Sequence, residues 1–248
     1  MTQQQVPDAQ TAATATEHEV GHHGESSSHG MRWLGIATLV SLAVFVYTSF
    51  FFAPEDEVQG VVQRIFYVHV ASAWIAALAF FVVFLGSIIY LARKDMRWDA
   101  LAGASAEVGL LFTTVVLVTG MLWGKAIWGV YWTWEPRLTS VLVLWLLYLA
   151  YVAVRAYVPE RTRKARFAAV IGIVAFLDVP IVYLSVMWWR TLHPQQVIIT
   201  ENGPQLPSAM LLAMFVGLIT FSLVYAYFVR MRLNINRLEE EIKREAAK

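Results

Sequence analysis

Residues 123–140 hold a dense group of aromatic side chains with cations among them. Four tryptophans and one tyrosine fall within twelve residues, together with a lysine and a following arginine: Trp123, Lys125, Trp128, Tyr131, Trp132, Trp134 and Arg137. Tryptophans that only anchor a protein in a membrane are spread over many helix ends. This concentration instead favours a platform for a planar ligand with anionic edges. Because Trp128, Tyr131 and Trp132 lie three or four residues apart, a short interfacial helix would present them on one face.

Glu135 and Pro136 stand just before an apolar run that begins at Leu138. Proline fits the first turn of a helix, where its missing N–H is not needed. A glutamate at the same place either caps the helix or orients the neighbouring Arg137. Of these two roles, we expect capping.

Two histidines are candidates for metal ligation. Four of the six lie in a polar N-terminal tail and are expected to bind metal weakly or not at all: His18, His22, His23 and His29. His69 and His193 remain, each near the end of an apolar run. A single histidine there more often makes a hydrogen bond, but two imidazoles on opposite faces of a haem leave its iron no open position for oxygen chemistry. Such a pair favours carrying haem over catalysis, if the fold brings both side chains together.

The composition places these residues in a membrane protein. Of 248 residues, 58% are hydrophobic and only 15% are charged, whereas soluble domains are about 25% charged. The net charge of +1 gives no basic surface for a nucleic acid. Cysteine is absent, which excludes disulfides, thiolate metal sites, a cysteine nucleophile and thioether attachment of haem.

Six apolar runs are long enough, or nearly so, to cross a hydrocarbon core of about 30 Å as helices. They cover residues 33–53, 65–91, 101–123, 138–154, 167–189 and 208–229. Each must be helical, because lipid offers no hydrogen-bond partner to an open backbone. We therefore predict an all-α integral membrane protein, a bundle of six transmembrane helices with a Trp-rich outer loop.

Lysine and arginine gather on one side of this predicted bundle. Fourteen lie in the second and fourth joints and in the C-terminal segment, whereas the other three joints hold only Arg64, Lys125, Arg137 and Arg190. Cytoplasmic loops carry such an excess, so both termini are predicted to be cytoplasmic. His69, His193 and the Trp-rich loop then share the outer surface.

The remaining segments flank a single domain. Residues 1–31 lack the apolar side chains of a core and are expected to form a disordered cytoplasmic tail. They have no apolar run after a basic start, so they do not resemble a signal peptide. We expect residues 32–232 to form the six-helix transmembrane domain and residues 233–248 to form a short cytoplasmic helical tail.

Two acidic residues fall inside the predicted spans. Asp178 lies two residues before Pro180, which is expected to kink its helix. Asp178 either fixes helix packing or serves a proton or substrate path. Glu107 is expected to reach water or a polar neighbour, and neither acid is assigned to the ligand site.

Three motifs, in order, resemble a known protein family. Residues 123–140 resemble the tryptophan-rich "WWD" signature of haem-handling proteins in bacterial cytochrome c assembly. Residues 53–70, with His69, are similar to that family's first outer loop, and residues 179–193, with His193, to its second. Six helices in a chain of this length resemble the cytochrome c maturation protein C (CcmC) branch, not the longer members that ligate haem to apocytochrome.

The resemblance, over about residues 32 to 232, implies a haem export and delivery component of the bacterial inner membrane, not an enzyme. Haem b would be held without covalent bonds, with His69 and His193 as axial ligands, and passed to the haem chaperone CcmE. The ABC-type subunits CcmA and CcmB and the small protein CcmD would be associated partners. The residues expected to hold haem are His69, His193, Trp123, Trp128, Tyr131, Trp132, Trp134, Glu135, Arg137, Lys125, Arg64 and Arg190.

The chain departs from the family pattern at three positions. Glu135 replaces the usual aspartate, Pro136 a small residue and Tyr131 a tryptophan. Among the cations, Arg137 is the favoured partner of a haem propionate. The main alternative function is a b-type cytochrome subunit for electron transfer or quinone reaction, although such subunits more often bury their histidines deep between helices.

Overall fold

The computed structural model describes residues 29–189, 191–193, 203 and 205–248. Arg190 and residues 1–28, with three of the tail's histidines, lie outside the described residues. Within the described part, six helices are long and apolar enough to cross a membrane, which confirms the predicted fold class. These spans are His29–Phe52, Val61–Arg93, Met96–Trp128, Pro136–Tyr157, Arg161–Trp188 and Ser208–Ala246.

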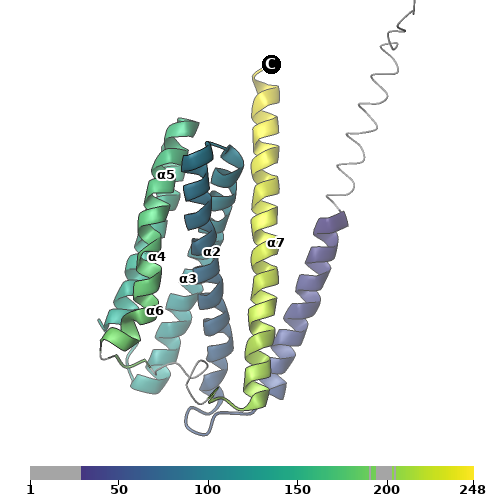
Figure 1. Ribbon diagram of the computed structural model, residues 1–248. Helices are drawn as coiled ribbons and strands as arrows, with labels where there is room; N and C mark the ends of the chain where they lie inside the picture. The colour runs from purple at the N-terminus through teal and green to yellow at the C-terminus, as the bar shows by residue number, and fades with distance from the viewer. Residues whose placement is uncertain (1–28, 190, 194–202, 204) are drawn as a thin grey trace, which may run out of the picture.

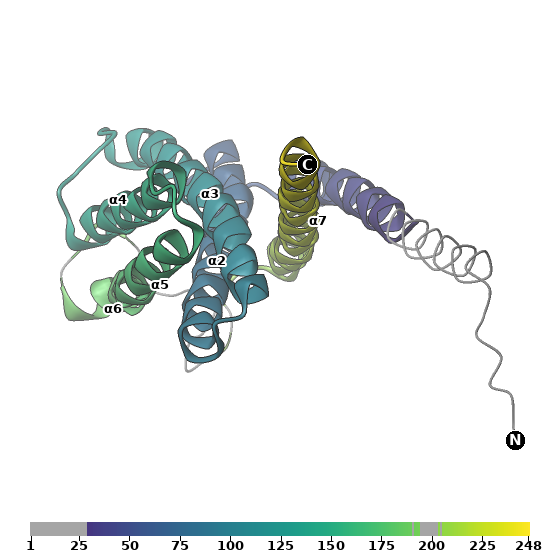
Figure 2. The same cartoon turned by 90° about the horizontal axis from the view of Figure 1, so that it is seen from above.

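Figure 1 shows the helices side by side along one axis. The first helix, which ends in the π-helical turn Thr48–Phe52, already includes residues 29–31 of the expected tail. The others are α2 (Ile65–Arg93), α3 (Met96–Trp128), α4 (Pro136–Tyr157), α5 (Arg161–Phe176), α6 (Asp178–Trp188) and α7 (Ser208–Ala246). Seen from above, α4, α5 and α6 lie on one side of α2 and α3, with α7 and the first helix on the other (Figure 2).

Short capped turns join the helices at the end of the bundle opposite the Trp-rich segment. Lys94, with a left-handed φ of 57°, ends α2, and the Asp95 side chain then accepts a hydrogen bond from Arg97 N (2.9 Å) to cap α3. Glu160 caps α5 in the same way, by accepting from the backbone N–H of Thr162 and Arg163. These turns make α2–α3 and α4–α5 antiparallel pairs.

Small residues bring the helices of the core into close contact. The buried Phe80 of α2 stacks on Tyr148 of α4, with ring centroids 3.5 Å apart. A Cβ added to Gly109 of α3 would come within 2.6 Å of the Phe80 ring, so only glycine fits at this crossing. The core therefore depends on a large aromatic pair set against glycine.

The fifth span is interrupted where the sequence predicts a kink. α5 ends at Phe176 and α6 begins at Asp178, two residues before Pro180. The proline ring clashes with the carbonyl four residues earlier, which is that of Phe176. Asp178 Oδ2 is buried at this break and has no hydrogen-bond partner among the described residues.

Acidic residues on one face of α3 hold two neighbouring helices. Asp99 binds both terminal nitrogens of Arg155 from α4, at 2.5 and 3.2 Å. Glu107, two helical turns further on, binds Arg232 of α7 at 2.5 and 3.1 Å, so its expected polar neighbour is confirmed. Gly103 lies between them, and a Cβ there would meet the Arg155 guanidinium at 2.6 Å. Beyond Arg232, α7 continues unbroken to Ala246.

We predict that Asp99→Asn destabilises the protein by about 3–5 kcal/mol, because it leaves the largely buried Arg155 guanidinium without its counter-charge. The measurement is thermal unfolding of detergent-purified protein. The matched control is Asp95→Asn, the same change in an exposed pair where asparagine still caps the helix. Equal unfolding midpoints for the two variants would contradict the prediction.

Candidate functional site

The two candidate histidines lie at the same end of the bundle. His69 sits in the second turn of α2, and His193 follows the end of α6 at Trp188. His69 interacts electrostatically with both His193 and Arg137. The fold therefore brings together two imidazoles and a guanidinium that are separated by up to 124 positions in the sequence.

His69 is held by α3. Its Nδ1 lies 2.9 Å from Thr119 Oγ1, and that hydroxyl gives its only proton to Val115 O at 2.6 Å. The hydroxyl oxygen must therefore accept from Nδ1–H, which leaves the lone pair of His69 on Nε2. A Cβ at Gly120 would come within 3.2 Å of the ring, so glycine makes room for the imidazole.

Trp123, one turn beyond Thr119 on α3, also packs against His69. Its ring meets His69 edge-on at 5.8 Å, and its Nε1–H donates to Gln59 Oε1 at 2.9 Å. A cavity of about 380 Å³ lies beside this group. Apolar side chains, Thr119 and Arg64 line the cavity, and Arg64 Nε is buried without a hydrogen-bond partner among the described residues.

His193 has a different partner. Its Nδ1 forms a short contact with Glu135 Oε1, and Glu135 Oε2 accepts from the backbone N–H of Leu192 at 2.7 Å. An ionised carboxylate can only accept, so Nδ1 carries the proton and Nε2 the lone pair. Trp128 packs edge-on against the same imidazole at 5.2 Å.

Both imidazoles thus keep Nε2 for a ligand while Nδ1 donates elsewhere. This is the usual arrangement of histidines that bind metals, because the second hydrogen bond fixes the tautomer and the ring. Burial lowers the pKa of His193, and the charge of Arg137 lowers it further, although Glu135 acts in the opposite direction. The ring is accordingly neutral near pH 7, the form that coordinates a metal.

The expected capping role of the Glu135 side chain is wrong. Glu135 does occupy the position before α4, with Pro136 first in the helix, but its carboxylate makes no capping bond. Its backbone oxygen accepts from Thr139 N at 3.0 Å, while the side chain turns to His193 and Leu192. The side chain is only 7% exposed, so it is committed to this contact.

The expected interfacial helix through Trp128, Tyr131 and Trp132 is also wrong. α3 runs on to Trp128 and stops at Gly129, whose φ of 77° is left-handed. The next residues are not helical until Pro136. Trp132 meets Trp134 edge-on at 5.6 Å, and Trp134 is 76% exposed. The aromatic residues therefore do not share one helix and do not form one flat face.

The candidate cations have different environments. Lys125 donates to Gly129 O at 2.8 Å and lies over the Tyr131 ring, so it closes the end of α3. Arg137 interacts electrostatically with Glu135 and with both histidines. Arg64 is partly paired with Glu55 at 3.8 Å, and Arg190 lies outside the described residues.

Three buried polar groups within five positions of Arg137 in the sequence have no hydrogen-bond partner in the described part of the chain. They are Trp132 Nε1, Thr133 Oγ1 and Thr139 Oγ1. Because a buried polar group without a partner is costly, such donors suggest a bound acceptor. Sequence reasoning missed the two threonines as well as Thr119 and Gln59. Nothing in the spacing marks them, because each acquires its place only through contacts between helices and loops.

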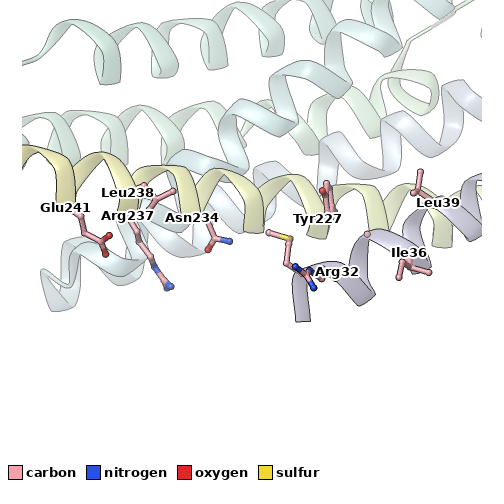
Figure 3. A pocket seen from close by; sticks show the side chains of 10 residues that line it. Arg32, Ile36, Leu39, Tyr227, Asn234, Arg237, Leu238 and Glu241 are labelled. Carbon is pink, nitrogen blue, oxygen red and sulfur yellow. The ribbon is translucent and has the colours of Figure 1, made fainter. Parts of the chain in front are cut away.

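A larger cavity of about 890 Å³ lies elsewhere, between the first helix and α7. It is lined by residues such as Arg32, Ile36, Tyr227 and Arg237 (Figure 3). This groove contains no histidine and lies toward the other end of the bundle. Its size alone does not make it the site of the chemistry described above.

The heme exporter protein C family matches residues 19–248 of the chain. The chain belongs to this family. A heme exporter protein C of Bradyrhizobium diazoefficiens is 37% identical over 212 residues, which cover 86% of this chain and 78% of that protein. One from Haemophilus influenzae is 33% identical over 207 residues, 84% of each chain. A putative cytochrome c biosynthesis ccmC-like mitochondrial protein of Marchantia polymorpha is 34% identical over 186 residues, 75% of this chain and 78% of that one.

The match to the heme exporter protein C family includes every candidate site residue named above. It confirms the resemblance drawn from the three sequence motifs. The roles of individual residues rest on the geometry of this chain.

We predict that Gly129→Ala costs about 1–2 kcal/mol of stability, because an alanine is strained at a left-handed φ. Gly129→Asn should cost less, since asparagine tolerates this conformation better. Thermal unfolding followed by tryptophan fluorescence measures both. If alanine and asparagine were tolerated equally well, the end of α3 would not depend on the left-handed residue.

Proposed function

We propose that this protein is a haem-handling component of cytochrome c biogenesis, which holds haem at the outer surface of the membrane and passes it on. The observation that carries the proposal is the pair His69 and His193: in each, Nδ1–H donates a hydrogen bond to an oxygen, and Nε2 keeps the lone pair that could bind a metal. Relatives that bear the name heme exporter protein C support the choice of cargo.

Haem suits the chemistry of this pair better than a bare ion does. Two imidazoles supply two ligands, and the porphyrin supplies the other four. The rings of Trp123 and Trp128 stand against the two histidines and provide apolar contact. Since the chain has no cysteine, the haem b would be held by axial bonds and packing alone, which allows release.

Arg137 is the proposed partner of a haem propionate. It interacts electrostatically with both histidines, and near it in the sequence lie polar groups of Trp132, Thr133 and Thr139 that have no partner among the residues the structure describes. A carboxylate would satisfy such a group through charge-assisted hydrogen bonds. Tyr131 and Trp134 are more exposed and would contact the outer edge of the cargo.

The charge distribution supports the orientation. Lysine and arginine are concentrated at the end opposite the histidines, so we place that end and both termini in the cytoplasm and the site at the outer face of a bacterial inner membrane. We propose the haem chaperone CcmE as acceptor, and CcmA, CcmB and CcmD as partners. In this role the protein carries haem and catalyses no bond change in it.

We predict that the purified wild-type protein shows the visible bands of bis-imidazole haem, and that His69→Ala and His193→Ala each lose them. The matched control is His29→Ala, a histidine at the far end of the first helix. Bis-imidazole bands that persist in both site variants would show that the ligand assignment is wrong.

Transfer separates the proposed carrier from a b-type cytochrome. Haem-loaded protein is mixed with purified CcmE, and the haem content of each protein is measured after separation. Movement of haem to CcmE is expected. Retention of haem together with quinone-dependent reduction would instead identify an electron-transfer subunit.

We further predict that Arg137→Ala weakens haem retention more than Lys125→Ala does. Arg137 acts on both histidines, whereas Lys125 is occupied with Gly129 O and the Tyr131 ring. Retention is measured as the rate of haem loss to an excess of apomyoglobin. The reverse order would overturn the assignment of the propionate partner.

A further inference from the structure

Glu135 joins two segments that are far apart in the sequence. Its Oε1 contacts His193 Nδ1, and its Oε2 accepts from Leu192 N at 2.7 Å. The carboxylate starts from the residue before α4 and reaches the segment after α6, a separation of 58 positions. At 7% exposure it is nearly shielded from water, which strengthens both bonds.

Each bond of this carboxylate constrains the same imidazole. The contact with Nδ1 sets the tautomer and the ring plane of His193, and the bond to Leu192 holds the preceding backbone. The N–H groups of Arg137 and Leu138 remain available for a cap at the start of α4, but the Glu135 carboxylate forms no capping bond. Glu135 is thus free of the capping role and available to His193.

The two candidate ligands therefore differ in their hydrogen-bond partners. His193 donates to a charged carboxylate, whereas His69 donates to the neutral hydroxyl of Thr119. A carboxylate partner raises the basicity of an imidazole and strengthens its bond to a metal more than a hydroxyl does. Arg137 acts on both imidazoles, and among the described residues only His193 has a carboxylate partner to offset that positive charge.

We propose that Glu135 is a positioning residue that makes His193 the firmer axial ligand, so that the bond to His69 is the one that opens first when haem is handed on. The proposal rests on the proposed function, since it concerns the same two ligands. Glu135 then acts through His193 and does not itself contact the cargo.

A double-mutant test isolates this effect. Haemin affinity is measured by titration in two backgrounds, His69→Ala, where His193 remains, and His193→Ala, where His69 remains. Adding Glu135→Gln should weaken haemin binding about 10-fold to 100-fold in the first background, the range typical when the hydrogen-bond partner of a metal ligand is changed. The same substitution should have little effect in the second background. Equal losses in both backgrounds would overturn the proposal, because Glu135 would then act on the fold or on the haem directly.

Two further variants provide controls. Glu135→Asp keeps the carboxylate and should restore most of the affinity in the His69→Ala background. Thr119→Val removes the partner of His69 and should weaken haemin binding only in the His193→Ala background. Failure of the aspartate to improve on glutamine would overturn the role of the charge.

Spectroscopy supplies a readout that a purely structural role would not change. Glu135→Gln in the otherwise wild-type protein should keep its bis-imidazole bands and raise the reduction potential of the bound haem, because the loss of negative charge behind His193 favours the ferrous state. An unchanged potential would contradict the proposal. If the wild-type protein itself showed no bis-imidazole haem, the proposed function would fail; if only the Glu135 variants behaved otherwise than expected, this inference alone would fail.

Discussion

Lipid offers no hydrogen-bond partner to a polypeptide backbone, and the arrangement of this protein follows from that constraint. The chain can cross the hydrocarbon only as helices, so in the described residues irregular backbone lies at the ends of the bundle, apart from the break between α5 and α6. The candidate ligand-binding side chains lie at one of these ends: His69 is in the second turn of α2, and His193 comes just after α6. Inside the bundle, the acidic residues Asp99 and Glu107 of α3 pair with Arg155 and Arg232.

A second consequence is that the loops must be held by specific side-chain contacts, because they lack the regular hydrogen bonds of the helices. Glu135 provides such a contact by binding His193 and the backbone of Leu192. Gln59 provides another by accepting from Trp123, which packs against His69. Each histidine is therefore positioned by residues from a different part of the chain, and the geometry of the site depends on the packing of the whole bundle.

The regular part of this structure was predictable from the sequence, and the contacts between loops were not. Six apolar runs and the kink before Pro180 follow from hydrophobicity and from the chemistry of proline, which act locally. The helix expected around Tyr131 was wrong, because the left-handed Gly129 ends α3 and a spacing of three or four residues cannot reveal that stop. Glu135 was expected to cap α4, since local rules consider only the helix that follows. Its actual partner lies 58 positions away and becomes visible only once α4 and α6 pack side by side.

A carrier of haem must hold its cargo firmly and still release it to another protein. Two equally strong axial bonds would serve the first need and obstruct the second, and either bond could open first. In the proposed carrier, different hydrogen-bond partners of the two imidazoles would make one axial bond stronger than the other and so meet both needs. In that proposal, the charged partner of His193 would help to retain the iron on one side, and the neutral partner of His69 would let an incoming ligand replace that bond. Arg137 acts on both imidazoles, so its contact with a propionate would persist while the ligands exchange. The cargo would then turn one defined face to its acceptor throughout the transfer.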